Sequence, residues 1–148
     1  MTHKKQQTLS AASSDAELWG TLDQLCNKAR YWLYTRKQRA KAERYADRLE
    51  MALTKLPKND LAIIRAEGLA LLFELRGQIP EAIVHRQREI RLMEQLRDEA
   101  RSPRYVTTTR RYMLRDRDQA ALRKRRAILE SLKKEKTQHG HNLIRKAQ

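Results

Sequence analysis

The chain has 148 residues and a net charge of +15, from 33 basic and 18 acidic side chains. Only 5% of its residues are aromatic, and it has four glycines, three prolines and one cysteine. This composition excludes an internal disulfide and a cysteine-based zinc site, and it disfavours a β-sheet, whose strands and turns need other residues. The length suits one domain, so we expect a single all-α domain of about five helices.

The first helices are predicted from a start signal and two apolar stripes. Residues 1–13 are polar and small, which predicts a disordered N-terminus. Ser14 to Glu17 has the form of a capping box, where a helix begins. The stripes that follow are Leu18, Leu22, Leu25, Ala29 and Trp32, and then Tyr45, Leu49, Ala52, Leu53 and Leu56.

The two stripes would lie on opposite sides of one straight helix, so they cannot both face the same partner. This favours two helices, over about 15–36 and 41–56, with a turn in the polar stretch 35–39. Because no glycine or proline marks this turn, one long helix that shifts its buried face remains an alternative.

A central helix is predicted over 61–75, where eleven of fifteen residues are apolar and surround the helix. Pro57 separates it from the preceding helix, and Gly77 is placed to end it. Pro80 fits the first turn of a fourth helix that ends near residue 100. Its predicted inward face is Ala82, Ile83, Ile90, Met93, Leu96 and Ala100.

The C-terminal third is predicted to hold a connector and a last helix. The β-branched run 105–109 is expected to be extended. Asp116 or Asp118 can cap a helix that reaches about Lys136, followed by a flexible tail over 137–148. The domain would then span 14–136, with a helical-hairpin core over 14–100 and a basic segment and helix over 101–136. The buried face of the last helix is predicted to be Ala121, Leu122, Ile128, Leu129 and Leu132.

Part of this pattern resembles a tetratricopeptide repeat. The residues at the matching spacings are Leu69, Ala70, Phe73, Gly77 and Ala82. Arg86 and Glu89 depart from the family pattern, and an earlier copy over about 29–57 lacks the turn glycine. The resemblance implies antiparallel helix pairs with a concave face that holds a partner segment, and it implies no catalysis. The same spacings also fit a plain helical bundle.

Charge is concentrated after residue 100, where 15 basic residues face 4 acidic ones. Between 101 and 126 arginine outnumbers lysine nine to one, and two tyrosines are interleaved. A guanidinium fits phosphate and stacks on flat rings, so this segment predicts binding of DNA or RNA. The candidate binding residues are Arg104, Tyr105, Arg110, Arg111, Tyr112, Arg115, Arg117, Arg123, Lys124 and Arg126. The alternative is a solvated face whose arginines pair with acids such as Glu94, Asp98 and Glu99.

Three smaller groups have both a functional and a structural interpretation. Trp19 and Trp32 are expected in the core. Tyr31 and Tyr34 could form a second basic–aromatic surface with neighbouring cations, which are Arg30, Arg36, Lys37, Arg39 and Lys41. His85 and Glu89, near Glu67 and Glu74, could bind a metal, but we expect the surrounding Arg86, Arg88 and Arg91 to pair those carboxylates instead. Cys26 is expected to be a buried thiol.

No phosphate-binding glycine loop, Ser/His/Asp set or paired-carboxylate signature occurs, so we expect no enzyme, catalytic residue, cofactor or metal. The predicted function is non-catalytic nucleic-acid binding, as a small accessory subunit of a nucleoprotein assembly. The alternative is a tetratricopeptide-like adaptor whose basic segment docks an acidic protein. A third hypothesis attaches the last helix to an anionic membrane. Without an apolar run of membrane-spanning length or a signal peptide, a cytoplasmic location is expected.

Overall fold

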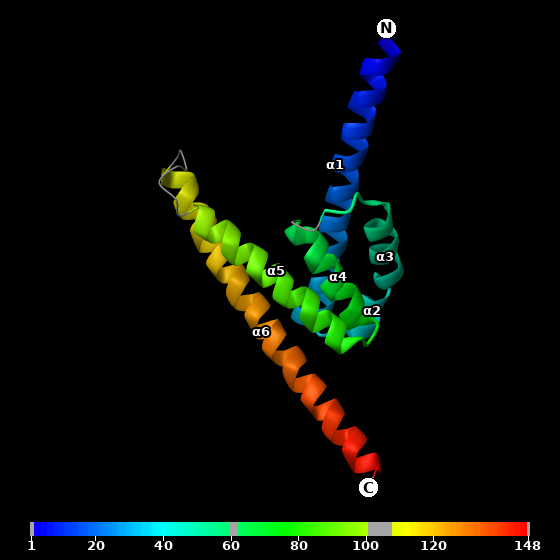
Figure 1. Ribbon diagram of the computed structural model, residues 1–148, viewed down its shortest axis with the longest axis vertical. Helices are drawn as coiled ribbons and strands as arrows, with labels where there is room; N and C mark the ends of the chain where they lie inside the picture. Colours follow the sequence, from blue (N-terminus) through cyan, green and yellow to red (C-terminus); the bar gives the residue numbers. More distant parts are fainter. Residues whose placement is uncertain (1, 60–61, 101–107, 148) are drawn as a thin grey trace.

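Helices form all the regular structure in the described part of the chain, as the computed structural model shows (Figure 1). The structure describes the backbone of residues 2–59, 62–100 and 108–147, and the side chains of 16–59, 62–99 and 119–138. Within these ranges there is no strand, which confirms the all-α prediction. Among the described residues, none of the helices combines the length and apolar character needed to cross a membrane.

The N-terminal half folds back on itself. Helix α1 (Thr2–Arg30) continues into a π-helical turn, η1 (Tyr31–Thr35), and the short helices α2 (Arg39–Glu43) and α3 (Ala46–Lys55) return beside it. The hairpin predicted for this region is therefore confirmed, and the single long helix is excluded. All residues of both predicted stripes are buried or partly buried in one cluster.

The turn of this hairpin is made without glycine. Lys37 takes a left-handed conformation with a φ of 51°. The Gln38 N–H then donates to the Trp32 carbonyl at 2.8 Å, and the Arg36 N–H donates to the Tyr31 carbonyl at 2.9 Å. These hydrogen bonds close the end of the helix on the carbonyls of the first two residues of η1, with Lys37 in the position that a glycine often takes. The chain can therefore turn here without a glycine, because Lys37 adopts the left-handed conformation.

We expect Lys37→Gly to raise the free energy of unfolding by about 0.5–1 kcal/mol. Glycine removes the cost of the left-handed conformation, and this gain is larger than the loss from the greater conformational entropy that glycine gives the unfolded chain. Lys37→Ala is the matched control, since it removes the same charge but keeps a Cβ atom. Urea unfolding followed by circular dichroism would measure both variants. Equal stabilities for the glycine and alanine variants would show that Lys37 is not strained.

Helix α4 (Ile63–Leu75) is the central helix, as predicted, because it packs on α1, α3 and α5. Gly77 has a φ of 74° and ends it, and α5 (Ile79–Ala100) begins with Pro80 in its first turn. Close packing at the middle of α4 depends on Gly68, where a Cβ atom would lie 3.1 Å from Leu22 and 3.2 Å from Leu53. A small residue therefore lets α1 and α3 approach α4.

Helix α6 (Thr108–Ala147) lies along α5 (Figure 1). A second apolar cluster joins these helices, and its buried members are Ile79, Ala82, Ile83, Ile90, Leu122, Leu129 and Leu132. Ile128 and Met93 pack against it, as predicted, but Leu96 is 41% exposed, so its place on the predicted inward face of α5 is wrong. Near Leu96 the described neighbours of α5 do not cover this side of the helix.

Three predicted helix ends are wrong. Helix α1 begins at Thr2 and not at Ser14, because residues 2–13 contain no proline or glycine to stop it. Helix α6 begins at Thr108, so Thr108 and Thr109 are helical and not extended, and it continues past Lys136 to Ala147. The threonines disfavour a helix by only about 0.7 kcal/mol each, which the neighbouring helix formers offset. The division into a domain and two tails stays a prediction.

Candidate functional site

Ionised side chains lie inside the helix bundle and join three of its helices. Arg86 on α5 is fully buried, and its Nη1 donates to Glu89 Oε1 at 2.6 Å. Arg125 on α6 donates from Nε to Glu89 Oε2 at 3.1 Å and from Nη2 to Glu67 Oε1 at 3.2 Å. Because Glu67 belongs to α4, the four side chains link α4, α5 and α6 across their interface. We call Glu67, Arg86, Glu89 and Arg125 the buried ion network.

The N-terminal hairpin joins this network at two points. The Tyr34 hydroxyl on η1 donates to Glu74 Oε2 at 2.7 Å and accepts from Arg86 Nη2 at 3.2 Å. Arg30 at the end of α1 forms an ion pair with Glu67. These contacts therefore hold α1 and η1 against the other three helices, because Tyr34 and Arg30 find their partners on α4 and α5.

Arg39 extends the same polar contacts to the end of α4. Its Nη2 donates to the backbone carbonyl of Glu74 at 2.8 Å, and its Nε pairs with Glu43 Oε1 at 3.0 Å. The last carbonyls of a helix have no partner within the helix, and a cation is favoured there. Arg39 thus closes the C-terminus of α4 and holds α2 against it.

Burial sets the electrostatics of this region. Burial raises the pKa of Glu67 above its usual range, and the nearby Glu89 carboxylate adds to this rise, while Arg125 and Arg30 oppose it. Burial also raises the pKa of Glu74 against its hydrogen bond from Tyr34, and it raises the pKa of the Tyr34 hydroxyl. Burial alone would lower the pKa of Arg86, but Glu89, Tyr34 and Glu67 together outweigh this effect, and the pKa is raised. Arg86 is therefore always charged, and the network depends on its carboxylate partner.

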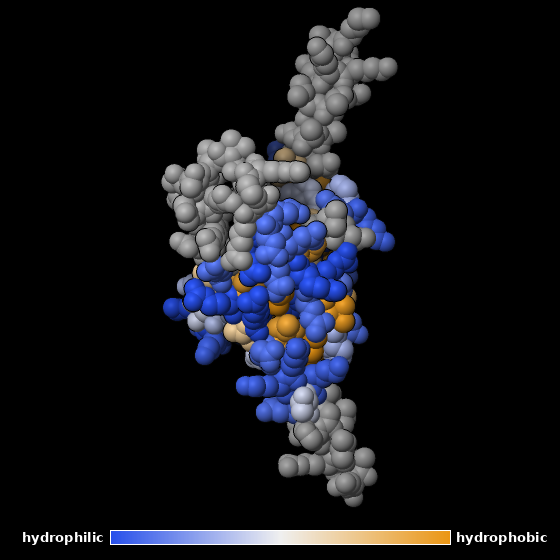
Figure 2. All heavy atoms as spheres, turned by 60° about the vertical axis from the view of Figure 1, so that its left-hand side comes forward, coloured by the Kyte–Doolittle hydropathy of each residue, from blue (hydrophilic) through white to orange (hydrophobic). Residues whose placement is uncertain are grey.

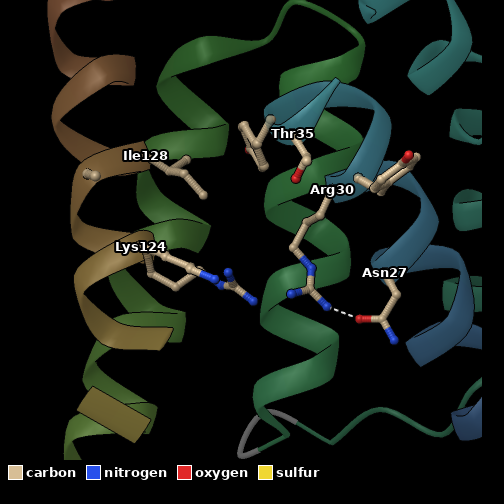
Figure 3. Close-up of a pocket in the computed structure, with 9 residues that line it drawn as sticks. Asn27, Arg30, Thr35, Lys124 and Ile128 are labelled. Atoms are coloured by element: carbon tan, nitrogen blue, oxygen red, sulfur yellow. Dashed lines mark hydrogen bonds between the residues drawn. The ribbon is translucent and has the colours of Figure 1, made fainter. Parts of the chain in front are cut away.

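A groove of about 440 Å³ lies beside the network, between α1–η1 and α6. Lys124 and Ile128 form the α6 wall, and Asn27, Arg30 and Thr35 face them from α1 and η1 (Figure 3). Arg30 donates to the Asn27 side chain, which holds it along this wall (Figure 3). None of the residues that line the groove is acidic. Segments almost a hundred residues apart thus form one basic groove.

Tyr31 and Lys124 are the groove residues most available to a ligand. Tyr31 is 46% exposed, and its ring contacts the Trp32 ring edge-on at a centroid distance of 5.2 Å. Lys124 is exposed and has no carboxylate partner among the described residues. By contrast, Arg30 and Arg125 direct their charge at Glu67. The groove therefore offers a ligand the ring of Tyr31 and the unpaired ammonium of Lys124, while Glu67 neutralises the arginines beside them.

The predicted binding residues fall into three groups. Arg104 and Tyr105 lie outside the described residues. The backbone of α6 holds Arg110, Arg111, Tyr112, Arg115 and Arg117, but their side chains lie outside the described part. Arg123, Lys124 and Arg126 are exposed on α6. Of these, Lys124 enters the groove, while Arg126 pairs with Glu94 at 2.9 Å, as the alternative interpretation of the basic segment expects.

The second basic–aromatic surface is only partly formed as predicted. Tyr31 lines the groove, but Tyr34 belongs to the buried contacts, and Arg30 and Arg39 are engaged in ion pairs. Trp19 and Trp32 pack against the first apolar cluster, as predicted. On the one face that Figure 2 shows, hydrophilic residues cover most of the described surface, with small hydrophobic areas between them.

The two smaller candidate sites have structural roles. Glu89 pairs with Arg86, as predicted, and also with Arg125 of α6, which was not among the predicted partners. His85 instead stacks on Phe73 at 5.2 Å, and burial lowers its pKa. No group of three or more metal-ligating side chains occurs among the described residues. The Cys26 thiol is fully buried, as predicted, and burial raises its pKa far above the usual range, which makes it a poor nucleophile.

The buried ion network is what sequence reasoning missed. Glu67 and Glu74 are seven residues apart on one face of the apolar helix α4, and both are buried. Two acids at this spacing in an apolar helix need buried cations as partners. Arg86 and Glu89 at i,i+3 on the next helix were the matching signal, and Arg125 completes the set from α6.

Comparison with known proteins gives no relative. No protein family matches this sequence, no curated protein matches it, and no solved structure matches the fold.

Proposed function

We propose that this protein binds nucleic acid without catalysing a reaction and serves as a small accessory subunit of a nucleoprotein assembly. The observation that carries the proposal is the groove lined by exposed Tyr31 and by Lys124, with no acidic residue in its lining. An aromatic ring beside a cation suits a base and its phosphate. The exposed Arg123 and the arginines before it in α6 would extend the phosphate contacts away from the groove.

The buried ion network supports this proposal because it shows which cations have a structural role and which remain free to bind a ligand. Arg30, Arg86 and Arg125 are committed to Glu67 and Glu89, so they hold the walls of the groove in place. The exposed Arg123 and Lys124 have no such partner in the described part of the chain, and with the arginines before them in α6 they form the proposed binding surface. Such a surface neutralises phosphates and releases counterions, which gives binding that weakens steeply with salt.

Two groove variants test the proposal by fluorescence anisotropy of labelled DNA and RNA. We expect Lys124→Gln to reduce the slope of log K against log salt by about 0.7–0.9, the loss of one phosphate contact. Tyr31→Ala should weaken binding by about 5- to 150-fold, the loss of one stacked base, and Tyr31→Phe should not. Lys134→Gln, an exposed lysine of α6 without an ion pair in the described part, is the matched control. Equal effects for Lys124→Gln and Lys134→Gln, or no binding by the wild-type chain, would contradict the proposal.

The alternative is a protein-binding adaptor of tetratricopeptide type. In its favour, α4 and α5 form a helix pair whose turn is Gly77 and in which Ala70 and Ala82 are fully buried. Ala127 and Ile128 also give the groove an apolar wall that would suit a peptide. A competition experiment with heparin separates the two functions. Heparin should displace a nucleic acid from the basic surface, whereas it should not displace an uncharged peptide from the groove of an adaptor.

A further inference from the structure

A second hollow, of about 350 Å³, lies between η1 and residues 41–48 and is lined only by basic and aromatic residues. These are Trp32, Lys41, Arg44, Tyr45 and Arg48. Lys41 Nζ lies 4.5 Å from the centre of the Trp32 ring, and the guanidinium of Arg48 lies 5.8 Å from that of Tyr45. The aromatic faces hold the two cations at the hollow by cation–π contacts.

The three cations of this hollow have no carboxylate partner among the described residues. All three acids of α2 and α3 are engaged elsewhere, since Glu43 pairs with Arg39, and Asp47 and Glu50 pair with Arg76. Lys41, Arg44 and Arg48 therefore repel one another around an open space, and an anion placed there would relieve this repulsion. The hollow is thus suited to phosphate, which accepts hydrogen bonds from several cations at once.

The groove and the hollow are joined by consecutive residues of η1. Tyr31 lines the groove, Trp32 lines the hollow, and their rings meet edge-on with an angle of 72° between planes. A ligand that follows this turn would pass from one aromatic face to the next and from Lys124 to the three cations. It would have to change direction at η1, and it would need unpaired bases to use the rings.

We propose that a single strand of nucleic acid runs from the groove across η1 into the hollow, with phosphates at Lys41, Arg44 and Arg48. This inference rests on the proposed function and names its ligand class. A duplex is stiff, with a persistence length of about 150 base pairs, and its bases are stacked inside, so it can neither follow one helical turn nor present bases to the rings. A single strand satisfies both requirements.

The test compares two triple variants of equal charge. The hollow variant is K41Q/R44Q/R48Q. The control variant removes three exposed cations that have no ion pair in the described part of the chain, K55Q/K58Q/R91Q. Fluorescence anisotropy is measured with a labelled single strand of about 6 nucleotides, one of about 16, and a duplex, lengths that bracket the usual site sizes on single-strand-binding folds. Circular dichroism confirms that both variants fold.

For the longer strand we expect the hollow variant to bind at least ten times more weakly than the control variant, with a salt slope reduced by about 2, the loss of three single-strand phosphate contacts. For the short strand and for the duplex, we expect the affinities of the two variants to differ by less than threefold. Equal affinities of the two variants for the longer strand, or an equal loss on the duplex, would overturn the inference while the groove variants still test the proposed function. Failure of the wild-type chain to bind any of the three probes would overturn both.

Discussion

Replacing Glu89 with glutamine should lower the free energy of unfolding by about 3–5 kcal/mol, because it leaves buried cations without their carboxylate. Glu89 is 1% exposed and holds both Arg86 and Arg125, at 2.6 and 3.1 Å. The glutamine has almost the same volume, so the loss is electrostatic and not a cavity effect. Urea unfolding followed by far-ultraviolet circular dichroism would measure it.

Two controls make this prediction specific. Glu130→Gln removes the same charge from an exposed pair with Lys133, and we expect a change below about 0.5 kcal/mol. Arg86→Met combined with Glu89→Gln should cost less than the sum of the single variants by about 1–3 kcal/mol, because the two residues act as one unit. A loss below about 1 kcal/mol for Glu89→Gln would show that the network does not hold the helices together.

Reversing the charge of four arginines at the start of α6 should abolish measurable nucleic-acid binding at near-physiological salt. The substituted residues are Arg110, Arg111, Arg115 and Arg117, all changed to glutamate. Removal of four phosphate contacts reduces the salt slope by about 3–4 and the affinity by at least about a hundredfold, and the new carboxylates repel the phosphates. Anisotropy with labelled single- and double-stranded DNA and RNA would measure both quantities.

The matched control for this variant carries the same net charge at exposed sites away from the predicted surface. Its reversed residues are Lys55, Lys58, Arg91 and Lys134. We expect it to weaken binding by less than tenfold, through the loss of long-range attraction alone. If the two variants lose affinity equally, binding follows net charge and the basic segment is not the site.

The fold was predictable wherever local residues decide local structure. The turn at Gly77 and the start of α5 at Pro80 were predictable because they depend on the backbone conformations of these two residues. Helix α4 was predictable because its apolar residues surround it. The hairpin turn was harder to predict, because Lys37 adopts a conformation that usually requires glycine. The start of α6 was wrong because β-branched threonines only weakly disfavour a helix.

The types of residue in the candidate site could be predicted from the sequence, but the position in the fold where they come together could not. Basic and aromatic residues near 31 and 124 were each candidates in the sequence, but only the packing of α1 on α4 and of α6 on α5 brings them to one groove. The buried ion network required knowing that Glu67, Glu89 and Arg125 meet across three helices. The spacing of Glu67 and Glu74 in an apolar helix indicates that buried cations are needed, but it does not identify which arginines supply them.

The most direct test of the central claim is a map of backbone amide and indole chemical shifts as a short single-stranded oligonucleotide is added to the isotopically labelled protein. We predict the largest changes at Tyr31, Lys124 and the Trp32 indole. The Trp19 indole is an internal reference that should stay unchanged, because Trp19 packs against the apolar cluster and lines neither the groove nor the hollow. Changes confined to other faces of the molecule, or no change at saturating oligonucleotide, would contradict the account.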